Sequence, residues 1–579
     1  RAARYDAPGR PGRGRPLSSA LNAYPLTRPA AAPVKGPQDD AFYDLVEARF
    51  RQILAAHPDL ATFVGIHTED DRLPDGSREA VAEDIRQARA QRAAVDAIDP
   101  ADLSPEVRFE RDVELHNLGL ELFSLEDQRQ WEQRSSAIDG LGDPLFALFA
   151  RNFAPLDERL GSIAARLEAV PRFLAEHRGR ARGPQVRLWQ QLELDSAETL
   201  PSFIDEIVAA GGDLPSVERR RLQAAADRAK AAVADYESFL QGTLETAVDG
   251  WPLGRELYDE LVRRRAFDGL DADQILEIGW QQLAENHAAR AAIAHQIDPT
   301  VDEAGVIDRI KTDHPATFEE ALEGYRDAML RARAHLIERS IVSVPDDERI
   351  EVIPTPEYLR NIMPFAAYFD APKFDRDPTG LYIVTPSVDG DPRAMREHNW
   401  SSISNTSIHE AYPGHHLQLA VAGRHPSLSR LAAQAAEFVE GRGMYSEQMM
   451  REEHFDDGLN FRLSMHTDAI WRACRIILDV RMHRGEIGVD EAIAWLVEQT
   501  SFETANARAE VRRYTHTPTY QLSYLLGKVL LLQLREDERG RKGESFSLKG
   551  FHDTLLRNGS LPISFHRRLL AGEGSSSGA

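Results

Sequence analysis

Apolar residues recur at three- and four-residue steps along most of this chain, and that spacing places them on one face of an α-helix. The stripes run through 41–54, 78–98, 105–127, 156–181, 215–246, 270–298 and 317–343. Strand-like sequence is scarce, and its clearest pieces are 340–354 and 381–385. A proline-rich, non-helical stretch lies at about 344–400, and helical patterns then resume to about 568. We therefore predict a mainly α protein with one small β-sheet.

The same patterns divide the chain into regions. Residues 1–40 are rich in Pro, Gly, Ala and Arg without a period, so we expect a disordered basic arm. Such an arm could contact an anionic partner, although a solvated tail is the commoner role of a terminus. We expect an N-terminal helical region at 41–343, and a second region at 344–568 that holds the sheet at 344–400 followed by helices. Residues 569–579 are expected to form a flexible tail.

Charge and cysteine content exclude several classes of protein. The net charge of −24 opposes binding to nucleic acid or to an anionic membrane surface. No unbroken apolar run reaches about 18 residues, so no membrane span is expected. The single cysteine, Cys474, rules out an internal disulfide framework and a cysteine-rich zinc site. Since no signal-type apolar stretch is visible, a cytoplasmic location is expected.

A histidine-rich segment, His409-Glu-Ala-Tyr-Pro-Gly-His-His416, contains candidate metal-binding and catalytic residues. In zincins, His-Glu-x-x-His on a helix places two histidines on one metal, and the glutamate activates water. Here the second histidine comes six or seven residues later, which is about 9 or 10 Å along a straight helix. Two zinc-bound nitrogens lie only roughly 3 Å apart. The helix must therefore be distorted between the histidines.

The residues between the histidines supply a cause for this distortion. Pro413 cannot donate a hydrogen bond to the carbonyl of His409, and Gly414 tolerates unusual dihedral angles. A bulge here could return His415 or His416 to the metal. The alternative is that Pro-Gly simply ends a helix and the histidines are polar surface residues.

A catalytic zinc also needs a third protein ligand and an open position. The next helical segment carries Glu437, Glu440 and Glu447 in apolar surroundings. Carboxylates on an apolar face are costly unless they are paired or metal-bound. Gly441 and Gly443 would allow the metal-bearing helix to approach closely. The alternative is an ordinary solvated acidic helix.

Three sequence blocks together resemble a known family. The first is His409-Glu-Ala-Tyr-Pro-Gly-His-His-Leu-Gln418, and the second is Glu440-Gly-Arg-Gly-Met-Tyr-Ser-Glu447. The third contains Glu510, Arg513, Tyr514, Pro518, Tyr524 and Gly527. They resemble the bacterial family called domain of unknown function eight-eight-five, which is grouped with the gluzincin metallopeptidases. The resemblance covers about 41–568 and implies a large helical zincin-like fold, with the sheet beside the active-site helix and a deep cleft.

The resemblance also implies roles for individual residues. His409, His415 and Glu440 are implied as the ligands of one Zn²⁺ per chain, which makes 344–568 the zinc-binding catalytic region, and Glu410 is implied as the general base. The family pattern holds the first histidine of the pair, which favours His415 over His416.

The sequence departs from the family at three positions. Arg442, Gly443 and Tyr520 stand where the family usually has tryptophan, alanine and glutamine. The departures at Arg442 and Gly443 affect the shape of the pocket rather than the ligands.

Further candidates come from the third block. A donor to the oxyanion could be Tyr524 or Tyr514, or else His516, although a tyrosine in such a block more often serves packing. Arg512, Arg513 or Lys528 could hold a substrate carboxylate, although a surface salt bridge is the commoner role of any one of them.

The leading interpretation is a zinc-dependent hydrolase, a metallopeptidase that cleaves short peptides with zinc-activated water. A zinc amidohydrolase acting on a non-peptide or modified amide is the alternative within enzymes, and the sequence does not separate the two. A non-catalytic helical binding protein with a structural metal is the alternative from another class. The expected partner is a small peptide or amide, and no oligomeric state is predicted.

Overall fold

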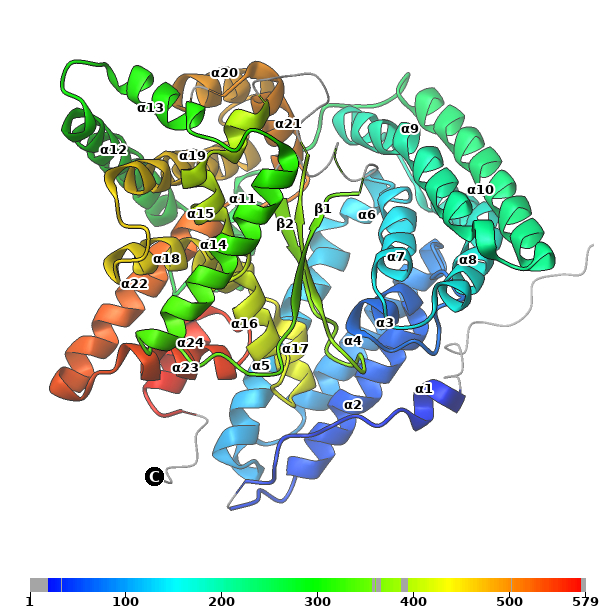
Figure 1. Ribbon diagram of the computed structural model, residues 1–579. Helices are drawn as coiled ribbons and strands as arrows, with labels where there is room; N and C mark the ends of the chain where they lie inside the picture. The colour runs from blue at the N-terminus through cyan, green and yellow to red at the C-terminus, as the bar shows by residue number, and fades with distance from the viewer. Residues whose placement is uncertain are drawn as a thin grey trace, which may run out of the picture.

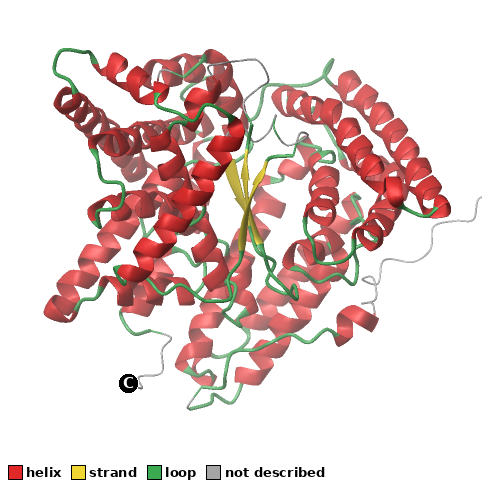
Figure 2. Cartoon of the chain, in the orientation of Figure 1, coloured by secondary structure: helices red, strands yellow, loops and turns green. Residues whose placement is uncertain are grey.

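The protein is mainly helical, with one small sheet near its middle (Figures 1 and 2). The computed structural model describes residues 19–32, 34–356, 360, 366–386, 394–500 and 502–573. This architecture confirms the prediction of a mainly α protein with one small sheet. Within the described residues, no helix is both long enough and apolar enough to cross a bilayer.

Helices α1 to α14 precede the sheet. They lie at Ser19–Ala23 (α1), Asp39–Ala56 (α2), Pro58–Val64 (α3), Arg78–Asp96 (α4), Pro105–Leu122 (α5), Gln130–Gln133 (α6), Asp139–Ala150 (α7), Leu156–Arg180 (α8), Arg187–Ala210 (α9), Ser216–Thr243 (α10), Arg255–Arg265 (α11), Ala272–Ile297 (α12), Glu303–Thr312 (α13) and Phe318–Glu338 (α14).

Strands and further helices complete the chain. The strands are Ile350–Pro354 (β1), Ala366–Phe369 (β2) and Gly380–Val384 (β3). The later helices are Trp400–Glu410 (α15), His415–Ala422 (α16), Leu428–Ala433 (α17), Ala436–Glu452 (α18), Leu459–His483 (α19), Val489–Thr500 (α20), Thr504–Tyr514 (α21), Ser523–Lys542 (α22), Leu548–Arg557 (α23) and Ile563–Leu570 (α24).

The predicted apolar stripes coincide with α2, α4, α5, α8, α10, α12 and α14. Two long helices have no predicted counterpart, α7 and α9, and each contains a proline, Pro144 or Pro201. Proline removes one backbone hydrogen bond, but a proline alone does not hide a helix, since the predicted α8 contains Pro171. In α9 the buried side chains of Phe203, Ile204 and Ile207 follow the proline, so tertiary packing outweighs that local cost.

The sheet has the strand order β1-β3-β2. β1 runs parallel to β3 with Ile350 opposite Gly380, and β2 runs antiparallel to β3 with Phe369 opposite Leu381. β1 and β3 confirm the strand-like pieces of the sequence, although β1 begins at Ile350 rather than near residue 340. β2 was not predicted, because its four residues are too few to show a period of two.

β3 separates two hydrophobic cores. Leu381 and Ile383 pack with the helices α7 to α10, whereas Tyr382 and Val384 pack with α11, α12, α14 and the helices after the sheet. This follows from the alternation of side chains along a strand. Figure 1 shows the sheet between these two groups of helices. Within the region expected at 41–343, α7 to α10 therefore contribute to one of these cores, whereas α11, α12 and α14 contribute to the C-terminal one.

Part of the expected N-terminal arm packs against the protein. Leu21 of α1 is buried, the guanidinium of Arg51 donates to its carbonyl, and the Tyr24 hydroxyl donates to the carbonyl of Phe374 (3.1 Å). The rest of the arm, residues 1–18 and 33, lies outside the described residues, as do 574–579 of the expected tail.

Helices α18 and α22 touch backbone to backbone through two glycines. A Cβ built on Gly527 would lie 2.0 Å from the carbonyl oxygen of Glu437 and 2.7 Å from the Cα of Gly441. No side chain fits between them. This contact sets the position of α18, the helix that carries the candidate ligand Glu440.

A matched pair of substitutions on α22 tests this contact. Gly527→Ala should lower the free energy of unfolding by about 1–3 kcal/mol, because the methyl group overpacks the interface. Gly540→Ala on the same helix meets nothing within 4 Å and should stabilise by about 0.5–1 kcal/mol through helix propensity. Urea denaturation measures both. Equal stabilisation of the two variants would contradict the close contact.

Candidate metal centre

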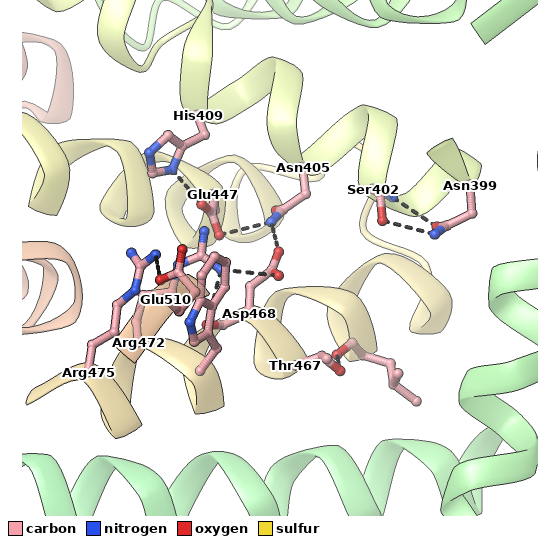
Figure 3. Close-up of polar contacts among 12 residues, drawn as sticks. Asn399, Ser402, Asn405, His409, Glu447, Thr467, Asp468, Arg472, Arg475 and Glu510 are labelled. Carbon is pink, nitrogen blue, oxygen red and sulfur yellow. Dashed lines mark hydrogen bonds and ion pairs between the residues drawn. The ribbon is translucent and has the colours of Figure 1, made fainter. Parts of the chain in front are cut away.

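The helix that carries the first histidine is interrupted before the second. α15 begins after Asn399, whose side-chain oxygen accepts a hydrogen bond from the Ser402 backbone N–H (3.0 Å; Figure 3). It ends at Glu410, and α16 begins at His415, with a cis peptide bond between Tyr412 and Pro413 in the connection. The predicted distortion is thus a complete break rather than a bulge.

Gly414 makes the break compact. A Cβ at this position would lie 1.8 Å from the carbonyl oxygen of His409 and 2.4 Å from that of Ile408, so only glycine fits. Its own N–H donates to the Ile408 carbonyl (3.0 Å). The chain therefore folds back on the end of α15, and the rings of His409 and His415 meet at right angles with centroids 4.7 Å apart.

The two adjacent histidines point to different partners. His415 Nε2 faces Glu440, whereas His416 Nε2 lies 2.7 Å from Glu348 Oε2 and its Nδ1 lies 3.0 Å from the Tyr368 hydroxyl. Tyr412 also donates to Glu348 (2.6 Å). Burial raises the pKa of Glu348, but hydrogen bonds from His416, Tyr412 and a nearby arginine lower it further, to about 2. His416 therefore belongs to a separate buried ion pair.

Glu440 of α18 faces both candidate histidines. Its Oε2 atom lies 3.3 Å from His415 Nε2 and 3.8 Å from His409 Nε2. Two ligands of a tetrahedral zinc, each bound at about 2.0–2.1 Å, lie roughly 3.3 Å apart. Burial raises the pKa of Glu440, but the two imidazoles lower it well below its usual range. These donors are spaced as the ligands of one ion are.

His409, Glu410 and His415 also form a group that could bind a metal, since potential ligand atoms of all three lie within 4.8 Å of one another. Glu410 and Glu440 are thus both within reach of the histidines. The structure brings together every residue implied as a ligand or a base.

A chain of hydrogen bonds orients His409. Its Nδ1 atom pairs with Glu447 (2.7 Å), and Asn405 donates to Glu447 (3.0 Å) and to Asp468 (2.8 Å), as Figure 3 shows. A metal-binding histidine typically donates its other ring N–H to a carboxylate in this way, leaving Nε2 free for the ion. Asn405 and Asp468 were not found from the sequence: Asn405 lies one helical turn before His409 on α15, but its contact with Glu447 is not encoded locally, and Asp468 lies on α19.

The centre carries an excess of negative charge. Its carboxylates are those of Glu410, Glu440, Glu447 and Asp468; Arg472 lies 3.3 Å from Asp468, and the buried Lys528 interacts electrostatically with Glu447. Burial lowers the pKa of His409, but Glu440, Glu447 and Glu410 raise it to about 10. Buried charge of one sign is costly unless it is compensated. A divalent cation would supply that compensation, so the residues present fit a bound metal.

Other residues of α18 shape the surroundings of the metal centre. Glu437 forms an ion pair with Arg265 (3.1 Å) and is directed away from the histidines. A Cβ on Gly443 would lie 2.5 Å from the His409 ring, so this departure from the family alanine leaves room for the histidine. Arg442 is buried and donates to the Pro413 carbonyl (3.3 Å), and burial lowers its pKa to about 10.

The candidate tyrosines separate into two groups. Tyr524 donates to the hydroxyl of Tyr520 (3.4 Å), and Tyr520 donates to Glu440 Oε1 (2.5 Å). Tyr514 instead donates to Glu510 (2.7 Å), in a cluster with Arg475. Tyr520 is thus the tyrosine that contacts a candidate ligand. The sequence showed it only as a departure from the family glutamine.

A cavity of about 1410 Å³ lies among α7, α9, α13, α19 and α21, and none of the candidate metal ligands is among the described residues that line it. Its lining includes Asp143 of α7, Asp195 of α9 and Arg513 of α21, together with the predicted oxyanion candidate His516. It also includes Trp471, three residues after Asp468, and residues of α13. Typical ligand pockets measure about 300–1,000 Å³, so this one has room for an extended ligand.

Comparisons with known proteins agree on the fold. Residues 58–570 match the family described as "Bacterial protein of unknown function (DUF885)". A solved structure described as a putative lipoprotein of unknown function from Shewanella oneidensis is 23% identical, with a TM-score of 0.76, covering 92% of this chain and 99% of that one. A putative lipoprotein from Colwellia psychrerythraea is 18% identical, with a TM-score of 0.80, covering 92% and 98%. No curated protein matches.

Substitutions on α18 test which carboxylate is the third ligand. Glu440→Gln should lose the metal, because a neutral amide is a poor ligand. Glu447→Gln should weaken retention by about 10–100-fold, the usual cost of an outer partner. Glu437→Gln should leave retention near that of the unmodified protein. Metal analysis after dialysis measures all three, and an empty site in Glu437→Gln would show that the ligand assignment on α18 is wrong.

The adjacent histidines provide a second test. His415→Ala should lose metal, because it removes a donor that faces Glu440. His416→Ala should keep metal while losing stability by about 1–3 kcal/mol, since Glu348 loses a buried partner. Metal content and a thermal melt separate the two effects. Metal retained in His415→Ala but lost in His416→Ala would overturn the assignment.

Proposed function

The chain belongs to the DUF885 family of bacterial proteins, and we propose that it is a zinc-dependent hydrolase, specifically a metallopeptidase that cleaves short peptides. The observation that carries the proposal is the spacing of Glu440 Oε2 from two imidazole nitrogens, 3.3 Å from His415 Nε2 and 3.8 Å from His409 Nε2. Two nitrogen donors and one carboxylate are the ligand set of catalytic zinc sites that keep an open position. His409, His415 and Glu440 would hold the ion.

The zinc would polarise a scissile carbonyl and make water a stronger acid. Glu410 is placed to act as general base, since it follows His409 directly at the end of α15. Among the described residues, no hydrogen-bond donor is found on its carboxylate, so its oxygens are free to accept a proton. Burial raises the pKa of Glu410, although His415 and His409 oppose this, and a raised pKa favours base catalysis.

The tyrosines next to Glu440 would complete the reaction site. The Tyr520 hydroxyl contacts Glu440, and the Tyr524 hydroxyl contacts that of Tyr520. Burial raises the pKa of Tyr524 to about 12, so its hydroxyl stays protonated and can donate at neutral pH. Such a donor can stabilise the oxyanion that forms during hydrolysis. Tyr514 is committed to Glu510, which favours Tyr524 for this role.

Two other functions stay open to test. A zinc amidohydrolase on a modified amide would use the same residues, and a peptide library separates it from a peptidase. A binding protein with a structural metal would show metal but no turnover. The cavity of about 1410 Å³, whose lining includes Glu510 and Trp471, three residues after Asp468, favours an enzyme, because a structural site needs no substrate space.

The solved relatives bear on location. Both are described as putative lipoproteins, and lipoproteins reside at the cell envelope. We propose an envelope location for this chain in place of the expected cytoplasm. A peptidase there would meet short peptides outside the cytoplasm.

Glu410→Gln tests the proposed mechanism. The variant should keep zinc and fold while its turnover falls by about 10²–10⁴-fold, because an amide cannot accept the proton. Zinc analysis and digestion of a short-peptide library, beside the unmodified protein, measure the two properties separately. An active variant would exclude Glu410 as the base. A metal-free variant would instead identify Glu410 as a ligand.

A further inference from the structure

Two guanidinium groups share one carboxylate oxygen on α21. Arg475 and Arg513 approach Oε2 of Glu510 at 2.8 Å and 3.0 Å. The Tyr514 hydroxyl donates to the same oxygen (2.7 Å). One carboxylate cannot neutralise two guanidinium groups, so this cluster keeps a net positive charge.

The cluster lies between the cavity and the metal centre. Glu510 and Arg513 line the cavity, and the side chain of Arg513 is 35% exposed, whereas that of Arg475 is 4% exposed. The guanidinium of Arg475 lies 4.7 Å from the ring centroid of Tyr524, which reaches Glu440 through Tyr520. Figure 3 shows Arg475 and Glu510 close to Arg472 and Asp468. Glu447 lies between this group and His409.

Neighbouring cations of the cavity already have acidic partners. Arg512 pairs with Asp195 (3.4 Å), and Arg134 pairs with Asp139 (3.2 Å). Glu198 and Glu503 add negative charge elsewhere on the lining. Arg513 is thus the partly exposed guanidinium that faces the cavity from a cluster with surplus positive charge.

We propose that Arg513 binds the C-terminal carboxylate of the peptide, and that the enzyme therefore acts on peptides whose C-terminus is free. The inference rests on the proposed function and narrows its substrate class. A guanidinium binds a carboxylate through two parallel N–H donors, which fixes direction as well as charge. Arg475, which lies over the Tyr524 ring and binds Glu510, holds Glu510 beside Arg513.

Paired substrates test the inference. N-acetyl-Ala-Ala-Ala and its C-terminal amide differ only in the charge at the end. The zinc-loaded protein should cleave the free acid with a kcat/KM about 10-fold or more above that of the amide, the size expected for hydrogen bonds to a charged group. In Arg513→Ala this ratio should fall towards one, mainly through KM, and Arg513→Lys should restore part of it.

Arg508→Ala is the matched control, because Arg508 is an exposed arginine on the same helix and does not line the cavity. It should keep the full ratio. Equal cleavage of acid and amide by the unmodified protein would overturn the inference, as would a loss in Arg513→Ala that affects both substrates equally.

A binding measurement keeps the inference separate from the proposed function. Calorimetry with N-acetyl-Ala-Ala-Ala and its amide, on the unmodified protein and on Arg513→Ala, needs no turnover. If neither peptide is cleaved but the acid binds more tightly than the amide through Arg513, the proposed function fails and the inference stands. If acid and amide bind equally, the inference fails whatever the turnover.

Discussion

The break in the helix at residues 411–414 is the constraint on which the centre depends. Gly414 places its backbone where any side chain would collide with the His409 carbonyl, and the next residue then returns to the end of α15. A straight helix would separate the two histidines by about 9 Å. The break instead brings their rings to 4.7 Å, and it directs His415 and His416 to different carboxylates.

Close backbone contact on both sides of α18 completes the arrangement. Gly443 leaves room for the His409 ring, while Gly441 and Gly527 let α22 touch α18. Together they bring Glu440 to the histidines and place Glu447 against His409 Nδ1. The resulting pocket holds more carboxylate than cationic charge, which is why it suits a divalent cation.

The sheet and the cavity connect this centre to the rest of the molecule. β3 presents one face to each hydrophobic core, so the N-terminal helices α7 to α10 are held against the half that carries the centre. The cavity has walls from both halves, with Asp143 and Asp195 on one side and Arg513 on the other. A substrate would therefore contact residues far apart in the sequence.

The sequence by itself determined the helical class, the positions of β1 and β3, the need for a distorted helix and the residues of the two motifs. Each of these depends on local spacing: apolar periods, a proline beside a glycine, and glutamates along one helix. Only the tertiary structure decided that His416 pairs with Glu348, that Asn405 and Asp468 support Glu447, and that Arg475 and Arg513 share Glu510. It also decided that α7 and α9 continue past their prolines. These features depend on contacts between distant segments, and no local period encodes such contacts.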